Sequence, residues 1–251
     1  MTRKGACHLC GQVKSLQNSH VVPRFGYKRY VANHARGGRF VDLEAGYAHN
    51  RQLKRYWFCK SCEGQFAETH AGTFLSNVDS SPNEGSYPYS GDLLRFAVSL
   101  SWRCAKYNKP ATQSHPDRGL LTRPMRYWKD FLRQRKLSPN PYSQHAFIAF
   151  GENIPEINAE WKQTMGNQIF PEERIVFSRI GPMVVFGFLD KRHLNRTERR
   201  ICEGSELSCA SGVVFSIHKG RRESLLTEGM ARVLDNVELR CIKRSSRVKG
   251  R

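Results

Sequence analysis

Four of the eight cysteines stand in two Cys-x-x-Cys pairs, Cys7 with Cys10 and Cys59 with Cys62. Two thiolates on one tight turn can face a single cation, and a tetrahedral zinc ion needs two such turns. Gly11 follows the first pair and can supply the positive φ that a tight turn requires. In a reducing compartment, paired spacing of this kind favours a metal over disulfide bonds. We therefore predict one structural zinc ion held by these cysteines, so that any chemistry must come from other residues.

A histidine and a carboxylate near the cysteine pairs could carry that chemistry. His20 stands at the end of an expected short strand and precedes Val21-Val22-Pro23, and Glu63 follows the second pair and begins an expected helix. A histidine can act as a general base, and a carboxylate is a natural ligand for Mg²⁺ or Mn²⁺. Two structural alternatives stay open. His20 could be a buried residue that bonds a main-chain carbonyl, and Glu63 an exposed carboxylate favoured by the helix dipole.

The two cysteine pairs with His20-Val21-Val22-Pro23 between them resemble the HNH endonuclease family in its four-cysteine, zinc-containing ββα-metal form. The resemblance covers the N-terminal segment only. It implies that His20 is the general base that activates water for attack on a phosphodiester. It also implies that the residue after the second pair, Glu63, binds a catalytic Mg²⁺ or Mn²⁺. The sequence departs from the family at Ser19, where the family has an acidic residue, and it lacks an asparagine in register before the second pair.

Ser19, Asn50, Glu68 and His70 are second-tier candidates. If Glu63 opens a helix, Glu68 points roughly 140° away from it, five residues on. His70 returns to the face of Glu63 but lies about 10 Å along the helix axis. One ion cannot easily bind both Glu63 and His70, so we expect Glu63 to act with His20.

The bulk charge indicates a polyanionic partner. Lys plus Arg number 41 and Asp plus Glu 22, a formal net charge of +19. Such a charge causes self-repulsion in the folded state, so a polyanionic partner is the natural explanation for it. We expect this partner to be a nucleic acid, and DNA rather than RNA. A generally basic surface with no partner is the alternative. The basic residues expected to contact nucleic acid lie around the cysteine pairs: Arg24, Lys28, Arg29, Arg51, Lys54, Arg55 and Lys60.

Two hypotheses of function follow. The first is a metal-dependent HNH-type endonuclease that hydrolyses phosphodiester bonds in DNA, in a setting such as bacterial or phage defence. The second is a non-catalytic, zinc-containing nucleic-acid-binding protein on a degenerate HNH scaffold. A protein partner that gates activity is compatible with the sequence, and the oligomeric state stays open. No apolar stretch approaches the roughly 18 residues of a membrane span, and the first residues lack a signal peptide's apolar run, so we expect a cytoplasmic protein without a membrane partner.

The helices and strands that the sequence predicts around these residues indicate an α+β protein. We expect a zinc-stapled, treble-clef-like ββα-metal module, then helices, then a mostly antiparallel β-containing region. Asp92 is the expected N-cap of one helix, which the spacing of Leu93, Ala97, Leu100 and Cys104 indicates, and a second helix spans about 124–135. Strands are expected at 146–150, 175–180, 183–189 and 212–217, with a hairpin turn at Gly181-Pro182 and a later helix around Leu226 to Val233. The expected divisions are a module at 1–77, a linker at 78–91, a helical segment at 92–137, an α/β region at 138–239 and a basic tail at 240–251.

Overall fold

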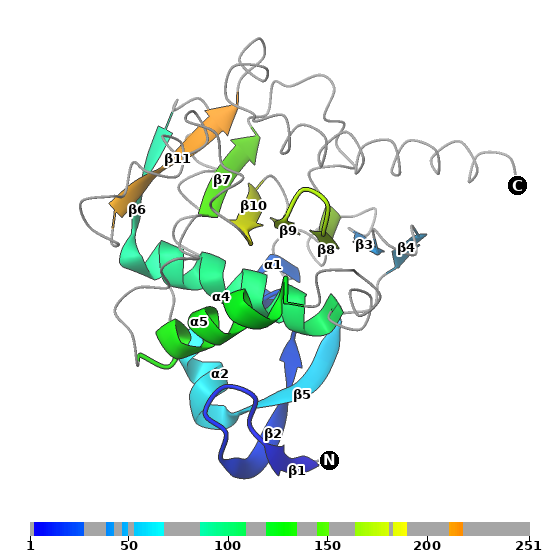
Figure 1. The fold of residues 1–251 in the computed structure, drawn as a ribbon. Helices are drawn as coiled ribbons and strands as arrows, with labels where there is room; N and C mark the ends of the chain where they lie inside the picture. The colour runs from blue at the N-terminus through cyan, green and yellow to red at the C-terminus, as the bar shows by residue number, and fades with distance from the viewer. Residues whose placement is uncertain are drawn as a thin grey trace, which may run out of the picture.

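The computed structural model describes residues 3–27, 39–42, 47–49, 53–67, 86–108, 119–134, 145–150, 164–180, 183–189 and 211–217. Two sheets of different size lie on opposite sides of a pair of helices (Figure 1). The mixed helix and largely antiparallel sheet confirms the predicted α+β class.

The smaller sheet carries the cysteine pairs. It is antiparallel with the order β1-β2-β5, and its strands are β1 (Arg3–Ala6), β2 (Val13–His20) and β5 (Lys54–Cys59). Two helices accompany it, the short α1 (Arg24–Gly26) and α2 (Lys60–Ala67), which continues directly from β5. Strand β2 ends at His20 as predicted, and an irregularity between Gln17 and Asn18 interrupts its pairing with β5.

The larger sheet has the order β4-β3-β8-β9-β10-β7-β11-β6. Its pairs are antiparallel except β3 with β8 and β11 with β7. The predicted hairpin is confirmed as β9 (Ile175–Ile180) against β10 (Met183–Phe188), although its turn lies outside the described residues. Two further predicted strands are also present, β7 (His145–Phe150) and β11 (Ser211–Ile217).

Four strands of this sheet were not predicted: β3 (Arg39–Asp42), β4 (Tyr47–His49), β6 (Ser86–Ser90) and β8 (Thr164–Phe170). Strands β3 and β4 belong to the segment expected within the zinc module, yet they extend the larger sheet at one end. Strand β6 occupies the end of the expected linker and forms the opposite edge. An edge strand tolerates Pro88, which cannot donate a main-chain hydrogen bond.

Helix α4 (Gly91–Asn108) lies between the two sheets, and α5 (Thr122–Leu132) packs beside it (Figure 1). Both helices were predicted, but α4 begins at Gly91, so Asp92 lies inside the helix and is not its N-cap. Helix α4 is buried on every side from Phe96 to Ala105, because sheets cover it from two directions. Pro124 stands in the first turn of α5, where its missing N–H costs no hydrogen bond, and Trp128 is fully buried.

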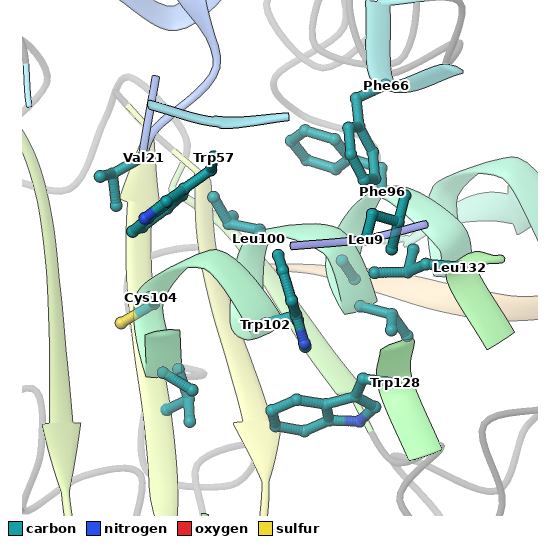
Figure 2. Packing of buried hydrophobic residues seen from close by; sticks show 14 of the residues in the cluster. Leu9, Val21, Trp57, Phe66, Phe96, Leu100, Trp102, Cys104, Trp128 and Leu132 are labelled. Atoms are coloured by element: carbon teal, nitrogen blue, oxygen red, sulfur yellow. The ribbon is translucent and has the colours of Figure 1, made fainter. Parts of the chain in front are cut away.

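One continuous cluster of buried side chains joins the small sheet, α4, α5 and the large sheet. Figure 2 shows part of it, with Val21 and Trp57 of the cysteine-bearing part near Leu100 of α4, and with Trp128 of α5. In the described part of the chain, no helix is long and apolar enough to cross a membrane. The predicted helix around Leu226 to Val233 and the basic tail at 240–251 lie outside the described residues.

Candidate metal centre and the residues around it

The four paired cysteines come together at one point. Cys7 and Cys10 lie in the turn between β1 and β2, Cys59 ends β5, and Cys62 lies in the first turn of α2. Their sulfur atoms all lie within 4.8 Å of one another. Zinc–sulfur bonds of about 2.3 Å place tetrahedral sulfurs roughly 3.8 Å apart, so only small adjustments separate this cluster from a zinc site. The donor set therefore fits the predicted zinc ion.

Main-chain hydrogen bonds shape the turn that holds the first pair. The N–H of Gly11 donates to the carbonyl of Cys7 at 2.8 Å, and the N–H of Cys7 donates to Gln12 at 2.9 Å. Gly11 has φ of 81°, the left-handed conformation that the sequence predicted for it. The N–H of Cys59 donates to Cys7 Sγ at 3.4 Å, a contact that orients and stabilises a metal-bound thiolate.

The thiols of Cys7 and Cys62 differ in acidity because burial and hydrogen bonds act on them differently. Burial raises the pKa of Cys7, but hydrogen bonds from main-chain N–H groups, that of Cys59 first, lower it to about 7. Burial and hydrogen bonds to the neighbouring thiols raise the pKa of Cys62 well above its ordinary value. Without a metal, Cys7 is therefore the more acidic of these two thiols, and a bound divalent cation would favour the thiolate form of both.

His20 is half-buried at the end of β2 and is held from two directions. Its ring lies 5.6 Å from the ring of Tyr27, measured between centroids. The Tyr27 hydroxyl accepts a hydrogen bond from the N–H of Leu53 at 3.1 Å, and the N–H of Val21 donates to the Leu53 carbonyl at 2.9 Å. On the other side, the carbonyl of His20 accepts a hydrogen bond of 2.6 Å from Nη1 of Arg103.

Glu63 lies in the first turn of α2, but the helix begins at Lys60, so Glu63 does not open it. The side chain is half-buried, and its Oε2 atom is fully buried without a hydrogen-bond partner among the described residues. An exposed carboxylate stabilised only by the helix dipole does not match this burial. Oε2 is thus an acceptor oxygen that remains available to a cation or a donor.

Arg103 of α4 is the residue that sequence reasoning missed. Its side chain is buried, 2% exposed, and its guanidinium carbon lies 4.4 Å from the ring centroid of Phe66 and 5.1 Å from that of Phe58. Burial lowers the pKa of Arg103, and the negative charge of Glu63 raises it. A signal was present in the sequence, because this arginine interrupts a long apolar helix between Trp102 and Cys104.

The remaining candidates are dispersed. Ser19 is buried, and its hydroxyl donates to the carbonyl of Gln17 at 3.3 Å. Arg55 lies over the ring of Tyr107 with its guanidinium carbon 4.9 Å from the centroid. The other described basic candidates, all at least partly exposed, are Arg24, Lys54 and Lys60. Six candidates lie outside the described residues, namely Lys28, Arg29, Asn50, Arg51, Glu68 and His70.

Within the described ranges, the four cysteines are the only group of three or more side chains arranged to hold a metal ion. Comparison with known proteins finds no matching family model, no matching curated protein and no matching solved structure. Function must therefore be argued from the site itself.

Proposed function

We propose that this protein is a metal-dependent HNH-type endonuclease that hydrolyses phosphodiester bonds in DNA, with its catalytic centre beside the zinc site. The observation that carries the proposal is the convergence of His20 and Glu63 on Arg103. The carbonyl of His20 bonds the Arg103 side chain, and the charge of Glu63 acts on the same guanidinium. Two residues far apart in sequence, singled out for their chemistry, are thus linked to the same buried side chain, His20 through its carbonyl and Glu63 through its charge.

In the proposed reaction, His20 takes a proton from the water that attacks the phosphorus atom. His20 is half-buried, and its ring lies against that of Tyr27, which restricts its movement. Glu63 Oε2, buried and without a described partner, fits a ligand of Mg²⁺ or Mn²⁺. Such ions commonly bind one or two carboxylates together with substrate phosphate oxygens and water, and they neutralise charge on the phosphate and leaving oxygen.

The charge of the cysteine-bearing part supports a nucleic-acid substrate. Glu63 is the only carboxylate within residues 3–27 and 53–67, and it is half-buried. The basic side chains of the same ranges are all at least partly exposed: Arg3, Lys4, Lys14, Arg24, Lys54, Arg55 and Lys60. Lys106 of α4 and Lys129 of α5 add positive charge near this part. Burial lowers the pKa of His8 most, and the charges of these two lysines lower it further. Contacts of this kind bind phosphates irrespective of sequence.

A second candidate function is non-catalytic nucleic-acid binding on the same scaffold. It is favoured by Ser19, whose hydroxyl already donates to a main-chain carbonyl and supplies no carboxylate. It is also favoured by Arg103, a buried cation close enough for the charge of Glu63 to act on it. Both candidates predict zinc and DNA binding, and only the first predicts cleavage.

The test is cleavage of supercoiled plasmid over a panel of divalent metals, with DNA affinity measured in parallel. The proposal predicts cleavage with Mg²⁺ or Mn²⁺ that is lost in His20→Ala while zinc content and DNA affinity stay constant. Asn18→Ala changes an exposed residue of the same strand and should cleave like the wild type. DNA binding without cleavage in any metal would replace the nuclease with the second candidate, and absence of DNA binding would refute both.

A further inference from the structure

We infer that Arg103 is a positioning residue of the proposed centre, which therefore spans the cysteine-bearing module and helix α4. Its side chain binds the main-chain carbonyl of His20 and packs on Phe66 of the helix that carries Glu63. The inference rests on the proposed nuclease function, and it adds a residue that lies outside the N-terminal segment that resembles HNH endonucleases.

Contacts of Arg103 reach three elements of the module. Nη1 bonds the carbonyl of His20 at the end of β2, at 2.6 Å. The guanidinium lies against Phe58 of β5 and Phe66 of α2 at 5.1 and 4.4 Å, distances typical of cation–π contacts. One side chain from α4 therefore touches the strand that ends in His20 and the helix that carries Glu63.

Stability alone does not explain a charge at this place. A fully buried guanidinium loses its hydration, and an apolar side chain of similar volume commonly packs there with no loss of stability. Arg103 Nε and Glu63 Oε2 are both buried without hydrogen-bond partners among the described residues. One is a donor and the other an acceptor, and their charges are opposite. The donor and the acceptor are therefore chemically complementary, and the charge of Glu63 acts on Arg103.

The hydrogen bond to His20 fixes the position from which the proposed base acts. The next residue, Val21, is already held by the Leu53 carbonyl, and the His20 ring lies against Tyr27. Arg103 supplies a further restraint, at the carbonyl of His20 itself. Since a displacement of about 1 Å at a catalytic group can cost roughly 100-fold in rate, this restraint should matter for turnover.

The experiment compares Arg103→Met and Arg103→Lys with Arg179→Met. Arg179 lies in β9 of the larger sheet and is also 2% exposed, so its replacement controls for the loss of a buried arginine as such. Each variant is tested for zinc content, circular dichroism, plasmid cleavage, and the NMR signals of the His20 ring with its contact to Tyr27. Arg103→Met should lower kcat about 100-fold with KM little changed. It should also shift the His20 signals and weaken the contact to Tyr27.

Arg103→Lys keeps the charge without the planar fork and should recover part of the loss, whereas Arg179→Met should leave kcat and the His20 signals as in the wild type. If Arg103→Met fails to fold, Arg103→Lys carries the same test with an intermediate effect. Unchanged His20 signals and kcat in folded, zinc-loaded Arg103 variants would overturn the inference. If the wild type cleaves no DNA, the proposed function fails, and the His20 signals alone decide whether Arg103 positions this residue.

Discussion

Replacing Glu63 by glutamine tests whether this carboxylate balances the buried charge of Arg103. Removing one member of a buried ion pair typically costs about 3–5 kcal/mol, because the other charge is left unpaired in a poorly polar environment. Glu63 is only half-buried and glutamine can still accept a hydrogen bond, so we expect a smaller loss, about 2 kcal/mol. In a chain of this length, that loss corresponds to a decrease in Tm of about 4–8 °C.

The dependence on Arg103 separates this charge effect from a general effect of the substitution. In an Arg103→Met background no buried cation remains, so Glu63→Gln should cost less than about 0.5 kcal/mol. The double-mutant cycle would then give a coupling free energy of about 1.5 kcal/mol between the two side chains. Thermal or urea unfolding of the four proteins, loaded with zinc and free of other divalent ions, measures these values. An equal loss from Glu63→Gln in both backgrounds would refute the pairing.

Two further predictions concern the zinc site. Zinc must displace thiol protons, and the pKa of Cys62 is raised whereas that of Cys7 is about 7. Because Cys7 holds its proton mainly below about pH 7, zinc binding should release one more proton there than above it, so apparent zinc affinity falls more steeply as the pH drops below about 7. Competition with a chelator across this range measures the slope, and an affinity independent of pH would contradict the assignment of the ligands. Gly11→Ala should destabilise the protein by about 1–2 kcal/mol, because φ of 81° is left-handed although no atom lies within 4 Å of an added Cβ. Gly64 has equally open space around an added Cβ but lies inside α2, so Gly64→Ala should stabilise the protein by about 0.5–1 kcal/mol. Thermal unfolding measures both variants. Tm shifts of the same sign would show that the backbone conformation of Gly11 does not explain the effect of Gly11→Ala.

Local patterns in the sequence predicted much of the framework. The two Cys-x-x-Cys pairs predicted the cysteine cluster, since each pair needs only one tight turn to face a cation. The β-branched and aromatic residues of Ile175–Ile180 and Met183–Phe188 predicted two strands of a hairpin, which are adjacent and antiparallel. The helix expected at about 124–135 is present as α5, with Trp128 and Leu132 on its buried side.

What the sequence did not predict depends on contacts between distant segments. Strand β8 has the sequence TMGNQIF, whose polar residues hide the alternation typical of a strand, and only its place between β3 and β9 makes it one. The spacing in α4 indicated one apolar face, but the helix lies between two sheets, so Ser99, Ser101 and Arg103 are buried as well. From sequence alone, an arginine is expected on the solvent-exposed surface. The contact of Arg103 with His20 follows only from the fold.

The most direct test of the proposed nuclease function is the rate at which His20→Ala nicks supercoiled plasmid in Mg²⁺ or Mn²⁺, relative to the wild type at equal zinc content. A general base contributes roughly 10²–10⁴-fold to a rate, so we expect a decrease of at least about 100-fold with DNA affinity retained. Equal rates for the two proteins would contradict the assignment of His20 as the base of this site.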